Sequence, residues 1–501
     1  MTDHNARRPL TARRIVLLAT ASGLAAAAIF TGASLPDGSW SSVQAAETMQ
    51  RPAGFADLAE KVKPAVISVR VKSDADAKKA AFDGGSPNSP MERFFRRFGE
   101  RDGMAPQMRQ LMPRDRSMND QGSGFFISAD GFAVTNHHLL DRAQAIEVVA
   151  EDGKTYSAKI VGTDPRTDIA LLKVEGRSDF PFVKLAEHAP RIGDWVLAVG
   201  NPFGLGGTVT AGIVSARGRD IGAGPYDDFL QIDAPVNKGN SGGPTFDMDG
   251  NVIGVNTAIF SPSGGSVGIA FDVPADVVKQ VVAQLKDKGM VTRGWIGVQV
   301  QPVTADIAEG LGFKTSQAGA LVAAPQADSP AAKAGILSGD VITAVDGKAL
   351  KDARDLAKLI GGMMPGTSVK LTVWRKGEEK SIAVTLGELP KEREARAATP
   401  AADAAAIEVP RLGLMLAPAG QVAGSGSEGL VVTGVEPGSL AAGHGLKTGD
   451  VILEVAGKKV ATPADVRNAV RDAHKDGKRT VLMRLKTDET TKFIAVQIAR
   501  A

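Results

Sequence analysis

The most informative stretch of the chain is Gly239-Asn240-Ser241-Gly242-Gly243-Pro244. A serine hydroxyl is a poor nucleophile unless a base takes its proton and backbone amides stabilise the oxyanion. Glycine at position 239 lets the backbone bend, so that the amides of Gly239 and Ser241 can converge on one point. Gly242 and Gly243 leave the hydroxyl unobstructed. Because a Gly-rich turn has a similar sequence, other parts of the chain must distinguish a turn from a nucleophile.

Two upstream segments supply the partners that a nucleophilic serine needs. Thr135-Asn136-His137-His138-Leu139 ends one expected strand, and Asp164-Pro165-Arg166-Thr167-Asp168 leads into another. The chain order His, Asp, Ser is that of the chymotrypsin-like triad, whereas an α/β-hydrolase has the order Ser, acid, His. The histidines after Ser241 are His444 and His474, inside a repeat near the C-terminus. The α/β-hydrolase interpretation is therefore excluded.

The sequence around these motifs is typical of β structure. Between Gly122 and about Pro274, short β-rich runs such as FFIS, FAVTN and VIGVNTAIF alternate with Gly, Pro, Asn and Asp. Regular short strands with turn clusters indicate an all-β barrel or sandwich rather than βαβ units. A helix is expected after Pro274, with four valines and Leu285 on one face and Gly289 as its C-cap.

The C-terminal part contains an internal repeat. The pattern of Ala320–Lys348, with Gly-Asp-Val-Ile followed by Val-x-Gly-Lys, recurs in Gly429–Lys458. The offset is 450 − 340 = 110 residues, the size of one small domain. Between the copies, Lys391–Ala406 is rich in alanine and charged residues and is typical of a flexible linker.

TNHHL, DPRTDIALLKV and GNSGGP resemble the HtrA (DegP/DegQ) family of serine endopeptidases. The resemblance implies a mostly β fold, in which a chymotrypsin-like double β-barrel protease domain is followed by two PDZ domains of the α+β class. It implies that His138 is the general base, Asp168 the acid that orients it and Ser241 the nucleophile. Gly239, Asn240 and Ser241 would form the oxyanion hole. The other histidine of the pair is then a neighbour without that role.

By the same resemblance, both repeats are PDZ domains. In the first, the carboxylate-binding loop and the strand after it match Arg293–Val298, where consecutive amides can capture a C-terminal carboxylate. The implied peptide-binding residues are Gly294, Trp295, Ile296, Gly297, Val298, Gln299 and Val300. The helix Asp352–Ile360 would form the opposite wall of the groove. The second repeat, around Arg411–Leu416, has fewer glycines, so both peptide binding and a purely structural role stay open there.

The resemblance also implies residues for substrate selection and regulation. The substrate pocket and activation loop would include Thr257, Ala258, Ile259, Phe260 and Ser261. No acidic residue lies between positions 251 and 270, so a preference for basic residues lacks its usual counter-charge. The resemblance implies cleavage after aliphatic residues such as Val or Ile, and the apolar loop agrees with this. Positions 217–228 would be the sensor loop that responds to a PDZ domain. Arg219 is the residue to test there, with a solvated arginine as the alternative.

The N-terminal segment 1–45 is expected to be an export signal. Two arginine pairs precede an uncharged run, Ile15–Leu35, and Val43 and Ala45 suit the −3 and −1 positions of a cleavage site. Cleavage near residue 45 or 46 would release the protein into the periplasm, with only transient membrane contact. A retained anchor is the alternative, because about 20 apolar residues can span a bilayer. Sec and twin-arginine export both stay open.

The remaining chain divides into five expected segments. Residues 46–121 hold a helix, a strand and a long loop at about 76–118, which the resemblance links to assembly. The other segments are 122–288 (the rest of the protease domain), 290–388 (first PDZ domain), 389–408 (linker) and 409–500 (second PDZ domain).

Length and composition narrow the possible functions. The chain has 501 residues, a formal charge of 59 − 56 = +3 and no cysteine. This length suggests about three domains. The lack of cysteine excludes a disulfide framework, a thiolate nucleophile and a Cys-ligated metal. Cleavage before Ala46 would remove four arginines and two aspartates and leave 55 − 54 = +1, so the basicity is no evidence for nucleic-acid binding.

We therefore expect an ATP-independent serine endopeptidase that degrades unfolded or misfolded envelope polypeptides. It would be regulated by C-terminal peptides at the PDZ domains and form trimer-based homo-oligomers, and chaperone activity is compatible with this function. No cofactor or metal is implied. Nucleic-acid binding is not implied either, because the Arg-rich segment Glu92–Arg116 carries no nucleic-acid motif. The alternative is a non-catalytic periplasmic chaperone or scaffold with a relic protease domain. The intact motifs favour the enzyme.

Overall fold

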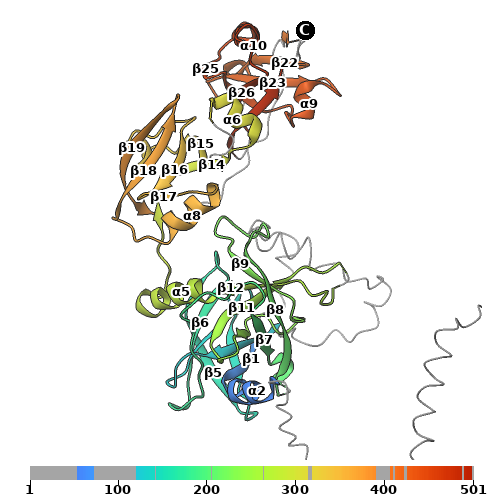
Figure 1. The fold of residues 1–501 in the computed structure, drawn as a ribbon, viewed down its shortest axis with the longest axis vertical. Helices are drawn as coiled ribbons and strands as arrows, with labels where there is room; N and C mark the ends of the chain where they lie inside the picture. Colours follow the sequence, from blue (N-terminus) through green and yellow to red (C-terminus); the bar gives the residue numbers. More distant parts are fainter. Residues whose placement is uncertain are drawn as a thin grey trace, which may run out of the picture. The chain divides into compact units, whose positions relative to one another are not determined.

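The computed structural model describes residues 54–72, 120–141, 143–204, 206–262, 264–313, 319–390, 407–409, 412–422, 426–487 and 490–498. Every helix and strand given below belongs to one compact unit, Phe55–Ala501. The export signal (1–45), the loop at about 76–118 and most of the linker (391–406) lie outside the described residues. Figure 1 colours the chain from blue at the N-terminus to red at the C-terminus.

The first barrel closes from six antiparallel strands in the order β1-β2-β3-β6-β5-β4. Its strands are β1 (Val66–Lys72), β2 (Asp120–Phe126), β3 (Phe132–Asn136), β4 (Ala145–Val149), β5 (Thr155–Asp164) and β6 (Ile169–Val174). Both faces of β6 are buried. Ala170 and Leu172 pack with Ile67 inside this barrel, whereas Ile169 and Leu171 join the core that it shares with the second barrel. This explains why IALLKV reads as a nearly continuous apolar run.

The second barrel has the strand order β10-β11-β12-β9-β8-β7. Its strands are β7 (Trp195–Gly200), β8 (Thr208–Arg219), β9 (Phe229–Ile232), β10 (Pro244–Phe246), β11 (Val252–Ile259) and β12 (Ala270–Pro274). The helix expected after Pro274 is confirmed as α5 (Ala275–Lys288), which ends at Gly289 with φ 70°. Its buried face (Val278, Val281, Val282, Leu285) packs onto the shared core. The expected double β-barrel is confirmed (Figure 1).

Short helices precede and connect these strands. They are α2 (Ala56–Val62), η1 (Lys63–Ala65), η3 (His138–Leu140) and η4 (Pro202–Gly204). Within the described ranges, no helix combines the length and the apolar character that crossing a bilayer requires.

The two repeats each form a small α+β domain, as expected. The first contains β13 (Gly294–Trp295), β14 (Val298–Pro302), α6 (Ala305–Leu311), β15 (Ala320–Pro325), α7 (Pro330–Lys333), β16 (Val341–Val345), β17 (Lys348–Ala349), α8 (Ala353–Gly361), β18 (Ser368–Arg375), β19 (Glu378–Thr385) and β20 (Gly387–Glu388). The second contains β21 (Ile407–Val409), β22 (Leu414–Pro418), η5 (Ala419–Gln421), β23 (Leu430–Val435), α9 (Leu440–Gly443), β24 (Val451–Val455), β25 (Lys458–Lys459), α10 (Pro463–Lys475), β26 (Thr480–Lys486) and β27 (Thr491–Gln497).

The same serine of the repeat caps a short helix in both domains. Ser329 caps α7 by accepting the N–H of Ala332, and Ser439 caps α9 by accepting the N–H of Ala442. The two domains also touch each other, because α6 of the first packs against β26 and β27 of the second (Figure 1). An apolar cluster that includes Ile307 joins them there.

Candidate active site

Asp168 and His138 are held together by two hydrogen bonds. The Asp168 carboxylate accepts one from His138 Nδ1 at 2.7 Å and one from the His138 backbone N–H at 2.9 Å. Asp168 is 1% exposed and has a left-handed backbone, with φ 58°. Because a carboxylate only accepts, Nδ1 must carry the proton, and Nε2 is then the ring nitrogen able to accept one. This is the arrangement that a general base requires.

The segment that carries Asp168 is fixed from both sides. The Asn136 side chain, at the end of β3, donates to the Asp168 carbonyl at 2.9 Å and to Thr257 Oγ1 at 3.0 Å. The N–H of His137 donates to the same carbonyl at 3.1 Å. The first histidine of the pair thus contributes its backbone here, while the second contributes its ring.

A buried ion pair anchors the other end of the same segment. Arg293, between α5 and β13, donates to both carboxylate oxygens of Asp164 at 2.9 and 2.5 Å. The two side chains are 9% and 4% exposed, and the Arg293 guanidinium lies 4.9 Å from the centre of the Tyr226 ring. Sequence reasoning treated Asp164 and Arg293 only as parts of separate motifs. Because the two positions are 129 residues apart in the chain, no local pattern indicates their pairing.

The glycines of the 239–244 stretch are needed for close approaches. Gly239 and Gly242 have φ angles of 94° and 82°, which side chains rarely adopt. A Cβ atom on Gly242 would lie 2.3 Å from the carbonyl oxygen of Ser123. Ser123 itself donates through Oγ to the Gly239 carbonyl at 2.6 Å, and through N–H to the Ser241 carbonyl at 2.8 Å. This fully buried serine of β2 supports the loop, and sequence reasoning missed it.

The backbone amides of the loop divide into two groups. The N–H of Asn240 donates to Asn237, and that of Gly242 donates to Asn256. Within the described part of the chain, the N–H groups of Gly239 and Ser241 donate to no protein group. Two unengaged amides on either side of Asn240 match the donors that an oxyanion hole needs.

Three segments of the chain match known domain families. Residues 122–255 match the trypsin-like peptidase domain, and residues 294–386 and 431–484 each match the PDZ domain. Over 508 aligned residues, covering 97% of each protein, the chain is 47% identical to a "Probable periplasmic serine endoprotease DegP-like" of Brucella suis. The chain belongs to the DegP-like serine endoproteases. A second DegP-like relative, from Rhizobium meliloti, is 45% identical over 96% of this chain and 99% of its own.

Solved structures agree with this family. The HtrA-type protease AlgW with decapeptide is 35% identical, with a TM-score of 0.53, and the match covers 68% of this chain and 100% of AlgW. The same protease with tripeptide gives a TM-score of 0.55 at 34% identity, over 68% of this chain and 98% of AlgW. The protein is thus a periplasmic serine endopeptidase, as the sequence predicted, and the non-catalytic alternative is not favoured.

The expected substrate pocket of this DegP-like enzyme lies at the end of β11. Thr257 and Ala258 are buried, and Thr257 Oγ1 donates to the Val255 carbonyl at 3.1 Å. Ser261 Oγ donates to the Gly265 carbonyl at 2.5 Å, and Phe260 is 36% exposed. The bond from Asn136 to Thr257 therefore links this loop to the backbone that holds Asp168.

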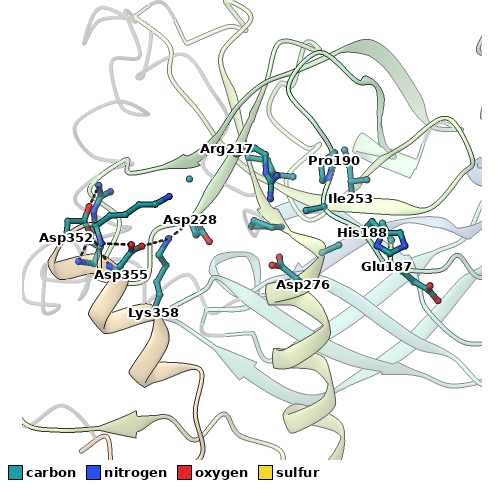
Figure 2. Close-up of a pocket in the computed structure, with 18 residues that line it drawn as sticks. Glu187, His188, Pro190, Arg217, Asp228, Ile253, Asp276, Asp352, Asp355 and Lys358 are labelled. Atoms are coloured by element: carbon teal, nitrogen blue, oxygen red, sulfur yellow. Dashed lines mark hydrogen bonds and ion pairs between the residues drawn. The ribbon is translucent and has the colours of Figure 1, made fainter. Parts of the chain in front are cut away.

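The expected sensor loop contacts α8 through its aspartates. Asp220 pairs with Arg354 at 2.9 Å. Asp228 pairs with Lys358 at 2.9 Å (Figure 2). Arg219, the residue singled out from the sequence, instead donates to Gln231 of the neighbouring strand β9 at 2.8 Å. The acidic residues that the structure brings to α8 were not distinguished by sequence reasoning, because aspartates are common in polar turns.

A cavity of about 480 Å³ lies beside these ion pairs. Figure 2 shows side chains of the sensor loop and of α8 around it, with Arg217 and Asp276 on the protease side and Asp352 and Asp355 on the PDZ side. Asp352 caps α8 by accepting hydrogen bonds from the backbone N–H groups of Arg354 and Asp355. Partial burial raises the pKa of the Asp352 carboxyl group, but these hydrogen bonds and the Arg354 guanidinium together lower it below its ordinary value.

In the first PDZ domain, β14 is an edge strand whose outer side pairs with no described strand. Val298 and Val300 face the cluster that contains Leu356 of α8. Gly297 has φ 73°, and the N–H groups of Ile296 and Gly297 have no partner within the described residues. An edge strand beside a helix, with unengaged amides at its start, matches the site where a peptide adds as a strand.

The expected peptide-binding residue Gln299 has another contact. Its side chain accepts the N–H of Thr491 at 3.0 Å, and Gln301 exchanges two hydrogen bonds with the backbone of Phe493 at 2.7 and 3.0 Å. Both partners lie on β27 of the second PDZ domain. The backbone of β14 thus lines the groove, while its glutamine side chains bind the neighbouring domain.

The second PDZ domain differs from the first at the same place. Strand β21 pairs antiparallel with β22, with Ile407 opposite Leu416 and Val409 opposite Leu414, and it lies against α10. Its direction is that of a peptide whose C-terminal end approaches the carboxylate-binding loop. Strand β21 thus occupies the edge of β22 beside α10, and it begins inside the segment expected to be linker.

Proposed function

We propose that Ser241, His138 and Asp168 are the catalytic triad of this endopeptidase. His138 Nε2 takes the proton of Ser241 Oγ as that oxygen attacks the peptide carbonyl, and then returns it to the leaving amine. Water hydrolyses the resulting acyl-enzyme by the same exchange of a proton through His138. Asp168 keeps Nδ1 protonated and stabilises the imidazolium. The observation that carries this proposal is the double hydrogen bond between Asp168 and His138.

The amides of Gly239 and Ser241 stabilise the oxyanion of each tetrahedral intermediate. Donors that are already oriented need no reorganisation during the reaction, and each typically accounts for about 100- to 1000-fold in kcat. Their lack of partners within the described residues supports this role, as does the left-handed φ of Gly239.

Labelling with a fluorophosphonate tests the triad. The reagent phosphonylates a serine only when a base activates it, so mass spectrometry should place the label on Ser241 in the wild type. His138→Ala should lose the label, while His137→Ala, the matched control, should keep it. Label on a different residue, or equal labelling of both histidine variants, would contradict the assignment.

We further propose that unfolded polypeptides are the substrates and that C-terminal peptides bind between β14 and α8 of the first PDZ domain. The unpaired edge of β14 supports this groove, and the apolar Thr257–Ser261 loop supports cleavage after Val or Ile. Asp220 and Asp228 then connect helix α8, one wall of this groove, to the protease domain. They take the regulatory role that the sequence assigned to Arg219. No ATP is required for this chemistry.

We also propose that residues 1–45 are an export signal and that the protein assembles into trimer-based homo-oligomers. The proposed limits of the remaining segments are 46–121, 122–288, 290–388, 389–408 and 409–500. In the second PDZ domain, β21 begins at Ile407, so we propose that this domain starts about two residues before the limit expected from sequence. Sedimentation of the Ser241→Ala protein with and without positions 76–118 tests assembly. An unchanged profile would count against a role of that loop in oligomer formation.

A further inference from the structure

Asp272 is a fully buried carboxyl group that the mechanism above does not use. It lies in β12, opposite Asn256 of β11 and Leu230 of β9, with 0% exposure. Neither carboxyl oxygen has a hydrogen-bond partner in the described part of the protein. A buried carboxyl group without partners is rare, because an ionised group in this position is strongly destabilised.

Few charges lie near this carboxyl group. The six strands of its barrel carry two other charged side chains, Arg217 and Arg219, both at the exposed end of β8. The face of α5 that packs against the barrel is apolar. Burial raises the pKa of Asp272 to about 7, and the nearby Thr245 hydroxyl acts in the opposite direction.

Glycine creates the space that this carboxyl group occupies. Gly254 pairs with Thr245 of β10 on one side and with Pro274 of β12 on the other, and a Cβ atom on it would lie 2.8 Å from the Asp272 Cβ. The carboxyl group therefore lies beside the Thr245 hydroxyl, across a position that has no side chain.

Thr245 and Asn256 connect this carboxyl group to the nucleophile loop. Thr245 Oγ1 donates to Asn256 Oδ1 at 3.2 Å. Asn256 Nδ2 donates to the Gly243 carbonyl at 2.9 Å, and the Asn256 carbonyl accepts the Gly242 N–H at 2.8 Å. Asn256 thus holds both glycines that follow Ser241.

The Thr245 hydroxyl has one proton to donate. When Asp272 is neutral, its O–H can donate to Thr245, and Thr245 can still donate to Asn256. When Asp272 is ionised, its carboxylate competes for the Thr245 proton, and Asn256 Oδ1 loses its donor in a buried site.

We propose that Asp272 is a positioning residue that must hold its proton for the nucleophile loop to keep its reactive geometry. The inference rests on the proposed role of Ser241. It adds an alkaline limit to the activity of the enzyme that is separate from the acid limit set by protonation of His138.

The test is the rate of Ser241 labelling by diisopropyl fluorophosphate between pH 5.5 and 9, in the full-length protein. If only neutral Asp272 supports the loop, a pKa of about 7 lowers the wild-type rate about 30-fold at pH 8.5 relative to its plateau. Asp272→Asn, which cannot ionise, should lose this alkaline limb and keep the acid limb. An equal alkaline limb in wild type and Asp272→Asn would overturn the inference.

Thr245 provides a second test that does not require Asp272→Asn to fold. Thr245→Ser keeps the hydroxyl and should keep the alkaline limb, whereas Thr245→Val removes the hydroxyl and should give a low rate with no limb. A Thr245→Val protein with the wild-type limb would overturn the inference. Mass spectrometry separates the two proposals, because label on Ser241 with an unchanged limb rejects only the role of Asp272, while label elsewhere rejects the triad.

Discussion

Replacing Asp164 with Asn should destabilise the protease domain strongly. The change removes the charge that neutralises Arg293, and both side chains of this pair are less than 10% exposed. Two hydrogen bonds, at 2.9 and 2.5 Å, hold the guanidinium against the carboxylate. Leaving one buried charge without its partner typically costs about 3–5 kcal/mol. This is a large part of the roughly 5–15 kcal/mol that stabilises a typical domain.

The assay is urea denaturation monitored by tryptophan fluorescence. All variants carry Ser241→Ala, which prevents self-cleavage. Asp164→Asn combined with Arg293→Gln should lose less than the sum of the two single changes, because the double variant leaves no charge in the buried site. Asp179→Asn is the matched control, since in its ion pair with Arg177 the two side chains are 78% and 31% exposed, and solvent-exposed pairs contribute little to stability. Equal losses for Asp164→Asn and the control would refute the reasoning.

Three further results are expected. The folded state raises the pKa of Asp272 from 3.8 to about 7 and so binds this proton more tightly than the unfolded chain does. The free energy of unfolding should therefore fall by about 3 kcal/mol from pH 4 to pH 7, and a wild-type slope in Asp272→Asn would contradict this. Replacing Ile407–Val409 with Gly-Ser-Gly should add a second peptide site by fluorescence anisotropy, and a single site would contradict the role of β21. Gly297→Ala should abolish peptide binding to the first PDZ domain, because its Cβ would lie 2.3 Å from that of Ser329, and unaltered affinity would contradict this.

The residues proposed as the triad could be singled out from the sequence, because each lies in a local motif whose chemistry constrains its neighbours. The order of His138, Asp168 and Ser241 excluded one fold class, and short strands bounded by turns indicated β-barrels. The helix after Pro274 followed from its apolar face and its C-terminal glycine. Helices and strands can be predicted from sequence alone where their apolar residues repeat with a clear period, or where a glycine marks a left-handed backbone conformation.

The supporting contacts were not predictable, because they join residues far apart in the chain. Ser123 is 116 residues from Gly239, and nothing in the DQGSGFF sequence of β2 indicates that it supports the nucleophile loop. The segment around Ile407 follows an alanine-rich stretch, and pairing with β22 gives it a strand conformation that its composition does not favour. Asp272 lies in a strand with otherwise apolar residues, and the lack of a side chain on the nearby Gly254 explains how its carboxyl group fits.

The most direct test of the central claim is casein hydrolysis by Ser241→Ala compared with wild type at equal concentration. The alanine variant should show no cleavage above the uncatalysed background while its urea denaturation profile matches that of the wild type, because only the nucleophilic oxygen is lost. Casein cleavage by folded Ser241→Ala at the wild-type rate would contradict the assignment of the nucleophile and of the triad built around it.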